Sequence, residues 1–112
     1  MYDDGKVTRD FIHVLDLAEA IKCCIENDYR ASNFETYNVG SQEGVTIREV
    51  LNLINKVSND KIQTISKPPR AFDCEFNVLS IHKINSELGW EPKIKIKKGL
   101  ENVWNWINSE IK

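Results

Sequence analysis

The chain has 112 residues, a hydrophobic fraction of 41%, a charged fraction of 29% and a net charge of −2 at pH 7. These values suit one globular domain, and the interspersed acidic and basic residues do not favour nucleic acid or an anionic membrane as a partner. No apolar run approaches the ~20 residues needed to span a bilayer, and the first residues lack the apolar core of a signal peptide.

The cysteines and histidines predict reduced thiols and no metal site. Cys23 and Cys24 are adjacent and Cys74 is distant, which is not the pattern of a disulfide framework. We therefore expect a cytoplasmic protein. His13 and His82 are the only histidines, and neither belongs to a metal-binding spacing such as HxxxH.

Two helices are expected in the first half of the chain. The first covers about 15–27 and has Asp16 as an N-terminal cap or first-turn acid. The second begins at a capping box that Thr46 forms with Glu49. Their apolar stripes consist of Leu17, Ile21, Cys24 and Ile25 in the first helix, and of Val50, Leu53, Ile54 and Val57 in the second.

Two further helices are expected near the end of the chain. The third covers about 81–88, with Ser80 as its cap and Gly89 as its stop. The fourth covers about 97–111, and Trp106 falls outside its apolar stripe. That stripe consists of Leu100, Val103, Trp104, Ile107 and Ile111.

Short extended runs lie between the expected helices. They cover about 7–13, 35–39, 61–66 and 75–79. Because these runs alternate with helices, the sequence predicts an α/β fold with a small, partly parallel sheet. Residues 1–112 contain no linker or repeat, so we expect a single domain.

Two arginines stand in local contexts that suit phosphate binding, because a planar guanidinium donates two hydrogen bonds to phosphate oxygens. Arg9 begins the first extended run, and Arg70 follows two prolines. Asp73, three residues later, is able to accept a hydrogen bond from a sugar or ribose hydroxyl. Taken alone, each arginine is more readily interpreted as a surface residue that pairs with a local acid.

Five segments of the chain, in order, carry a family resemblance. They are Arg9-Asp10-Phe11-Ile12-His13 with Asp16-Leu17-Ala18, Tyr37-Asn38-Val39-Gly40, Thr46-Ile47-Arg48-Glu49-Val50, Pro69-Arg70-x-x-Asp73, and Lys83 with Leu88-Gly89-Trp90-x-Pro92. Together they resemble the C-terminal substrate-binding part of extended short-chain dehydrogenases/reductases, the NAD-dependent epimerase/dehydratase family, and most of all its UDP-glucose 4-epimerase-like members. The resemblance covers almost the whole chain and implies a fragment of a larger enzyme, without its Rossmann domain.

The resemblance also implies roles for four residues. Arg9 and Arg70 would bind the pyrophosphate of a nucleotide sugar, a UDP-sugar by preference, and Asp73 would contact the ribose. The sugar-facing position, a tyrosine in some epimerases, falls on Asn77. Because of this difference, the resemblance does not predict which sugar is bound. NAD would be bound by an N-terminal domain that this chain lacks. The apolar surface that faces that domain would favour a homodimer or an exchange of elements between copies.

The parts that catalysis in this family requires are not recognisable in the chain. The cofactor needs a glycine-rich turn, whereas Gly40 and Gly44 have the wrong spacing. The Tyr-x3-Lys pair would have to be Tyr2 and Lys6, which Asp-Gly separates at a chain end. We therefore expect nucleotide-sugar binding without catalysis. The alternative is a stand-alone interaction module that descends from this family and has no ligand role.

Overall fold

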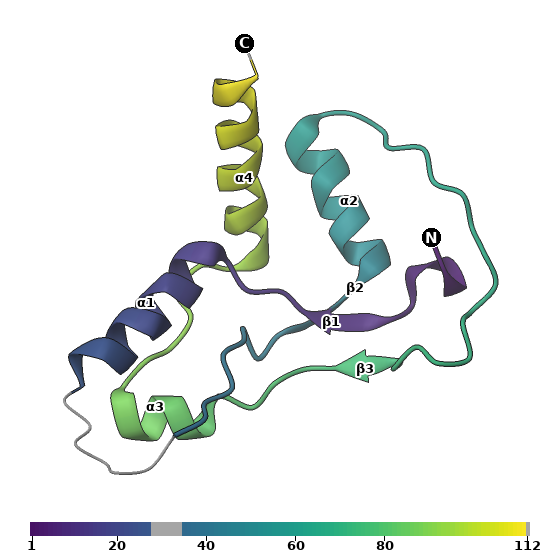
Figure 1. The fold of residues 1–112 in the computed structure, drawn as a ribbon. Coiled ribbons are helices and arrows are strands. Elements are labelled where there is room, and N and C mark those ends of the chain that lie inside the picture. The colour runs from purple at the N-terminus through teal and green to yellow at the C-terminus, as the bar shows by residue number, and fades with distance from the viewer. Residues whose placement is uncertain (28–34, 112) are drawn as a thin grey trace.

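A computed structural model describes residues 1–27 and 35–111 (Figure 1). The predicted α/β fold with four helices is confirmed. No helix in the described part of the chain has the length and apolar character to cross a membrane. The elements in order are the 3-10 turn η1 (Asp3–Gly5), β1 (Thr8–Asp10), α1 (Val14–Glu26), β2 (Gly44–Thr46), α2 (Ile47–Ser58), β3 (Phe76–Asn77), α3 (His82–Leu88) and α4 (Ile96–Glu110).

The sheet has three short strands in the order β2-β1-β3. β1 runs antiparallel to β2 and parallel to β3, so the predicted partly parallel sheet is confirmed. Arg9 lies in the central strand, where its Cα pairs with those of Val45 and Asn77. The sheet therefore places Arg9 between the segment that leads into α2 and the segment that leads to α3.

The predicted strands differ from the observed ones in three places. Residues 35–39 form no strand, because Tyr37 and Val39 pack their side chains against the core instead of joining the sheet. The run at 61–66 also forms no strand. β2, by contrast, is not among the predicted extended runs. It lies against β1 because Gly44 has no side chain: a Cβ there would be 2.8 Å from the Thr8 Cγ2 atom.

The hydrophobic core is small and lies between α1, α3 and the segment that follows α3. Its buried apolar residues are Ala20, Ile81, Ile84 and Trp90. The indole Nε1 of Trp90 donates to the backbone carbonyl of Asp16 at 3.2 Å. This bond joins the start of α1 to the end of α3.

Asp16 is a buried first-turn acid rather than the cap of α1. Its carboxylate accepts from the backbone N–H groups of Lys93 at 3.1 Å and Ile94 at 2.9 Å. The cap is His13, whose Nδ1 accepts from the Leu15 N–H at 3.2 Å. Asp16 therefore ties α1 to the segment that enters α4.

The apolar stripe predicted for α1 does not face the core. Leu17, Ile21 and Ile25 are 39%, 54% and 78% exposed, whereas Asp16 and Ala20 are buried. The bonds of Asp16 fix the rotation of the helix, and the small side chain of Ala20 allows close packing beside Trp90. The predicted stripe is instead an exposed apolar surface.

The helix-end predictions were confirmed for α2 and only in part for α3. Thr46 Oγ1 accepts from the Glu49 N–H at 3.2 Å, and the Glu49 carboxylate accepts from the Thr46 N–H at 2.8 Å. The bond from the Thr46 N–H and a second one from the Thr46 hydroxyl, at 2.7 Å, both end on the Glu49 carboxylate and hold the pKa of Glu49 below its ordinary value. Gly89 ends α3 with a φ of 67°. However, Ile81 occupies the cap position of α3, and Ser80 contributes only a long bond of 3.5 Å, from the His82 N–H to its hydroxyl.

The described chain is flat and open (Figure 1). Its radius of gyration is 17.1 Å and its extents are 51 × 41 × 19 Å. A compact domain of about 100 residues has a radius of gyration of about 13 Å. Trp106 of α4, which fell outside the predicted stripe, is 64% exposed. Much of the apolar surface is thus accessible, and the candidate sites are surface hollows.

Candidate functional site

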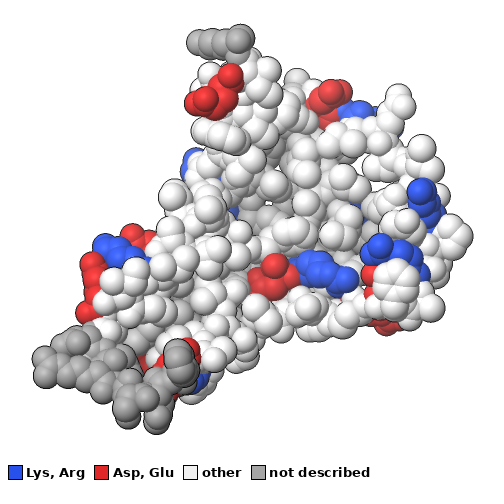
Figure 2. All heavy atoms as spheres, in the orientation of Figure 1, with Lys and Arg blue, Asp and Glu red and all other residues white. Residues whose placement is uncertain are grey.

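Three of the four predicted binding residues line one hollow. Arg9, Arg70 and Asp73 share a hollow of about 650 Å³. The remaining walls come from the N-terminal segment, the first turns of α2 and residues 63–67. On the face drawn in Figure 2, basic side chains gather toward the side of β1 and η1.

Arg9 is held by backbone carbonyls. Its Nη1 donates to the carbonyl of Thr8 at 2.8 Å and to that of Cys74 at 2.7 Å. The second bond ties the loop that carries Arg70 and Asp73 to the central strand. The convergence of the predicted residues is therefore maintained in part by Arg9 itself.

Arg70 and Asp73 are brought together by a four-residue turn. The Asp73 N–H donates to the Arg70 carbonyl at 3.1 Å, which closes the turn. The Arg70 Nε and Nη2 atoms then donate to the two Asp73 carboxylate oxygens at 2.8 and 2.7 Å. This pairing raises the pKa of Arg70 above its ordinary value. The guanidinium is therefore charged and fixed in orientation.

Asn77 lies beside the hollow and not in its wall. Its Cα pairs with that of Arg9 in the parallel register of β1 and β3, and its side chain is exposed. The structure thus brings Arg9, Arg70 and Asp73 together around one hollow, with Asn77 one strand away from Arg9.

Sequence reasoning missed Tyr2 and Lys67, which also line the hollow. The segment Lys67-Pro68-Pro69-Arg70 contained a signal, because two cations flank a stiff diproline. Tyr2 carried no local signal. It reaches the hollow through a parallel bridge to Lys67, far away in the sequence.

Asp10 is a third residue whose role the sequence did not reveal. One carboxylate oxygen accepts from the Ser41 N–H at 2.6 Å, and the other accepts from the Leu79 N–H at 3.1 Å and the Gln42 N–H at 3.3 Å. A Cβ at Gly40 would lie 2.5 Å from this carboxylate, so only glycine fits there. Asp10 therefore connects the end of β1 to two distant segments.

The glycine-containing loop at 40–44 does not fit a dinucleotide cofactor. A dinucleotide pyrophosphate needs free backbone N–H groups at a turn that leads into a helix. Here the N–H groups of Ser41 and Gln42 already donate to Asp10, a carboxylate that would repel phosphate. The start of α2 is likewise occupied by the Glu49 carboxylate.

Tyr2 and Lys6 do not form a catalytic pair of the Tyr-x3-Lys kind. Such a pair requires one turn of α-helix, but η1 is a 3-10 turn in which Asp3 and Asp4 have φ angles of 44° and 49°. The Lys6 ammonium lies 3.7 Å from the Asp3 carboxylate. Tyr2 instead faces Arg70.

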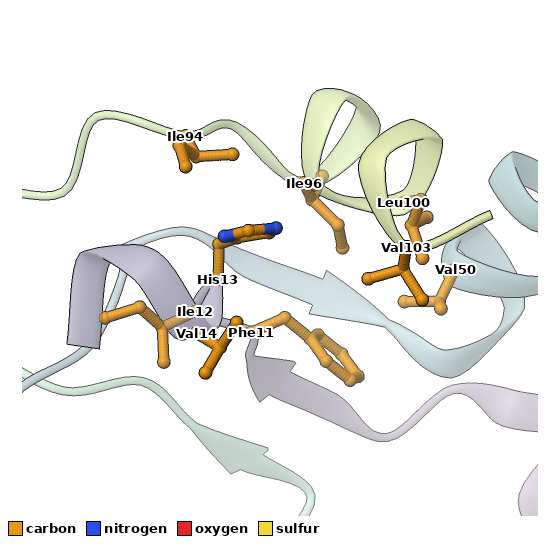
Figure 3. A pocket seen from close by; sticks show the side chains of 10 residues that line it. Phe11, Ile12, His13, Val14, Val50, Ile94, Ile96, Leu100 and Val103 are labelled. Atoms are coloured by element: carbon orange, nitrogen blue, oxygen red, sulfur yellow. The ribbon is translucent and has the colours of Figure 1, made fainter. Parts of the chain in front are cut away.

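A second hollow, of about 360 Å³, lies between the β1–α1 connection, α2 and α4 (Figure 3). Its wall is apolar apart from His13, whose ring lies among the side chains that Figure 3 labels. His13 Nδ1 is already used as the cap of α1. This groove has no charged group to bind a phosphate. The candidate site is therefore the hollow lined by Arg9, Arg70 and Asp73, called the charged hollow below.

Neither metal nor disulfide chemistry is suggested by the described residues. No cluster of three or more metal-ligating side chains is found in residues 1–27 and 35–111. Cys23, Cys24 and Cys74 are free thiols, and Cys24 and Cys74 are exposed.

Comparisons with known proteins identify the family of this chain and agree with its fold. The GDP-mannose 4,6 dehydratase family model matches residues 1–103. UDP-glucose 4-epimerase 4 of Oryza sativa subsp. japonica is 35% identical over 106 residues, which cover 94% of this chain and 29% of the relative. The chain therefore spans less than a third of this relative's length.

Two solved structures share the fold at higher coverage of this chain. UDP-glucose 4-epimerase of Thermotoga maritima with UDP-glucose has a TM-score of 0.87 and 26% identity, covering 100% of this chain and 35% of its own. UDP-glucose 4-epimerase of Bifidobacterium longum with NAD+ and UDP has a TM-score of 0.82 and 30% identity, covering 98% and 33%. The chain therefore belongs to the GDP-mannose 4,6 dehydratase family, among the epimerases and dehydratases of the extended short-chain dehydrogenases/reductases.

Proposed function

We propose that this chain is the nucleotide-sugar-binding C-terminal part of an NAD-dependent sugar-nucleotide epimerase or dehydratase, of the UDP-glucose 4-epimerase kind. The observation that supports this function is the convergence of Arg9 and Arg70, far apart in the sequence, on one hollow. The similar solved epimerases contain UDP-glucose or UDP, which makes a UDP-sugar the proposed ligand.

The proposed roles follow from the chemistry of the side chains. Arg9 and Arg70 would bind the diphosphate, because guanidinium groups match phosphate oxygens in geometry and charge. Asp73 would accept from ribose hydroxyls while it orients Arg70. Asn77, next to Arg9 in the sheet, would lie beside the sugar of the bound ligand. NAD, bound by the rest of the parent enzyme, would supply the hydride acceptor, so the 112-residue chain is proposed to bind without catalysis.

Titration of the chain with UDP, followed by NMR, tests this function. We expect shifts that cluster around the charged hollow. Arg9→Ala and Arg70→Ala should each raise the Kd for UDP about tenfold or more, because each removes a charge-assisted hydrogen-bond donor. Lys97→Ala is the matched control, since it removes one positive charge from α4, outside the hollow.

A spectrum that does not change at millimolar UDP would contradict the proposed function. It would favour the alternative, an interaction module without a ligand role. Equal effects of Arg9→Ala and Lys97→Ala would also count against the site, because they would show that only net charge matters.

The exposed stripe of α1 supports a proposal about assembly. Leu17, Ile21 and Ile25 lie on one accessible helix face. We propose that the rest of the parent enzyme covers this face, and that copies of the 112-residue chain cover it by association. Sedimentation should show concentration-dependent dimers that Ile21→Glu abolishes and Trp106→Glu, on α4, does not. A monomer at all concentrations would refute self-association.

A further inference from the structure

Tyr2 and Lys67 form a part of the hollow wall to which the roles above assign nothing. The Lys67 Nζ atom lies 5.8 Å from the centre of the Tyr2 ring, and the Arg70 Cζ atom lies 4.3 Å from the same centre. A cation is attracted to the face of an aromatic ring by the ring's quadrupole. One tyrosine ring therefore holds two cations on the same wall.

The backbone fixes this arrangement. The Asp3 N–H donates to the Lys67 carbonyl at 3.1 Å, and the Lys67 N–H donates to the Met1 carbonyl at 2.8 Å. These bonds form the parallel bridge between Tyr2 and Lys67. The two residues are thus neighbours because two distant segments pair, and not through side-chain contact alone.

Two of the three positively charged side chains of the hollow, those of Arg9 and Lys67, are not balanced by a carboxylate of the described residues. Arg70 is paired with Asp73, whereas the hydrogen bonds of Arg9 go to backbone carbonyls. Within residues 1–27 and 35–111, no carboxylate pairs with the Lys67 ammonium. Like charges on one concave wall repel one another unless an anion lies between them, and such a wall attracts anions.

The unpaired cations match the charge of the proposed ligand. The diphosphate of a sugar nucleotide carries a negative charge on each of its two phosphoryl groups. Arg9 and Lys67 offer one uncompensated positive charge for each group, while Arg70 adds its planar fork of donors. A lysine suits this position because its ammonium is a flexible point charge with three rotatable donors.

We propose that Lys67 is a third phosphate-binding cation of the hollow, and that Tyr2 is a positioning residue that holds Lys67 and Arg70 side by side. This inference rests on the proposed function and extends it by assigning a role to Tyr2 and Lys67 in the wall of the hollow. The ligand class is a nucleoside diphosphate, and the diphosphate is the part that Lys67 contacts.

Titrations with UDP, UMP and uridine test the role of Lys67. We expect Lys67→Ala to raise the Kd for UDP about three- to tenfold, less for UMP, and not at all for uridine. The effect should shrink at high salt, because the site is exposed and screened. Lys97→Ala is the control for the loss of net charge, and dispersed amide spectra confirm that each variant is folded.

The positioning role of Tyr2 is tested by comparing UDP binding of two variants, one of which keeps the aromatic ring. Tyr2→Phe retains the aromatic face and should bind UDP as the unmodified chain does. Tyr2→Leu removes the face and should weaken UDP binding to the level of Lys67→Ala, with no effect on uridine. Wild-type affinity in Tyr2→Leu would overturn the positioning role.

The outcomes separate this inference from the proposed function. If Lys67→Ala behaves like Lys97→Ala while Arg9→Ala still weakens UDP binding, the role of Lys67 is wrong and the proposed function stands. If the unmodified chain does not bind UDP, both are overturned.

Discussion

Replacing Trp90 by alanine should destabilise the chain by about 3–5 kcal/mol, the usual cost of deleting a large buried aromatic side chain. Trp90 is 4% exposed and is one of the four buried apolar core residues found in 1–27 and 35–111. The substitution also leaves the Asp16 carbonyl without its indole donor. Because single domains are stable by only about 5–15 kcal/mol, this loss removes a substantial part of the free energy of unfolding. Urea denaturation followed by far-UV circular dichroism measures the loss.

Trp106→Ala is the matched control for this prediction. Trp106 is 64% exposed on α4, so the same chemical change should cost within about 0.5 kcal/mol. Trp90→Phe should fall between the two variants, because it retains most of the packing and loses the donor to Asp16. If Trp90→Ala were no more destabilising than Trp106→Ala, the core described here would be wrong.

The features that the sequence predicted well are local ones. The capping box of α2 joins Thr46 to Glu49, three residues apart, and Gly89 ends α3 through a bond to Asn85. Such features depend on residues within one helical turn, so their pattern is visible in the sequence. The start of α3 is an exception, since Ser80 has the right side chain but the helix begins after Ile81.

The features that the sequence did not predict depend on distant contacts. Periodicity gave α1 an apolar face, but it did not show which face is buried. That choice is made by the bonds from Asp16 to Lys93 and Ile94, more than 70 residues later. β2 likewise forms because Gly44 meets Thr8 of another strand. Neither partner is visible in the local pattern.

The residues of the candidate site likewise fall into those that the sequence predicted and those that it did not. Arg9, Arg70 and Asp73 were identified because their segments resemble a known family, and the structure places all three around one hollow. Their convergence depends on the bond from Arg9 to Cys74. Tyr2 and Lys67 were missed because they reach the hollow only through the pairing of the N-terminal segment with residues 65–67.

Replacing Asp10 by alanine is the second change for which we expect a large effect. Its carboxylate accepts backbone N–H groups from Ser41, Gln42 and Leu79, and it also accepts the Ser41 hydroxyl at 2.5 Å. The substitution removes the acceptor of the half-buried Ser41 and Leu79 N–H groups and of the exposed Gln42 N–H, which should cost about 2–4 kcal/mol in total. Because Asp10 adjoins Arg9 at the end of β1, UDP binding should weaken as well.

Amide hydrogen exchange locates the effect of this substitution. In Asp10→Ala the amides of Ser41 and Leu79 should exchange faster than those of α2, because the first two lose their acceptor directly. Asp60→Ala is the control: among the described residues, the carboxylate of Asp60 accepts only from the N–H of its neighbour Lys61, so its loss should leave exchange and UDP binding unchanged. Uniform acceleration of all amides in Asp10→Ala would instead show that the carboxylate supports global stability and has no particular role in joining β1 to the two segments beside the site.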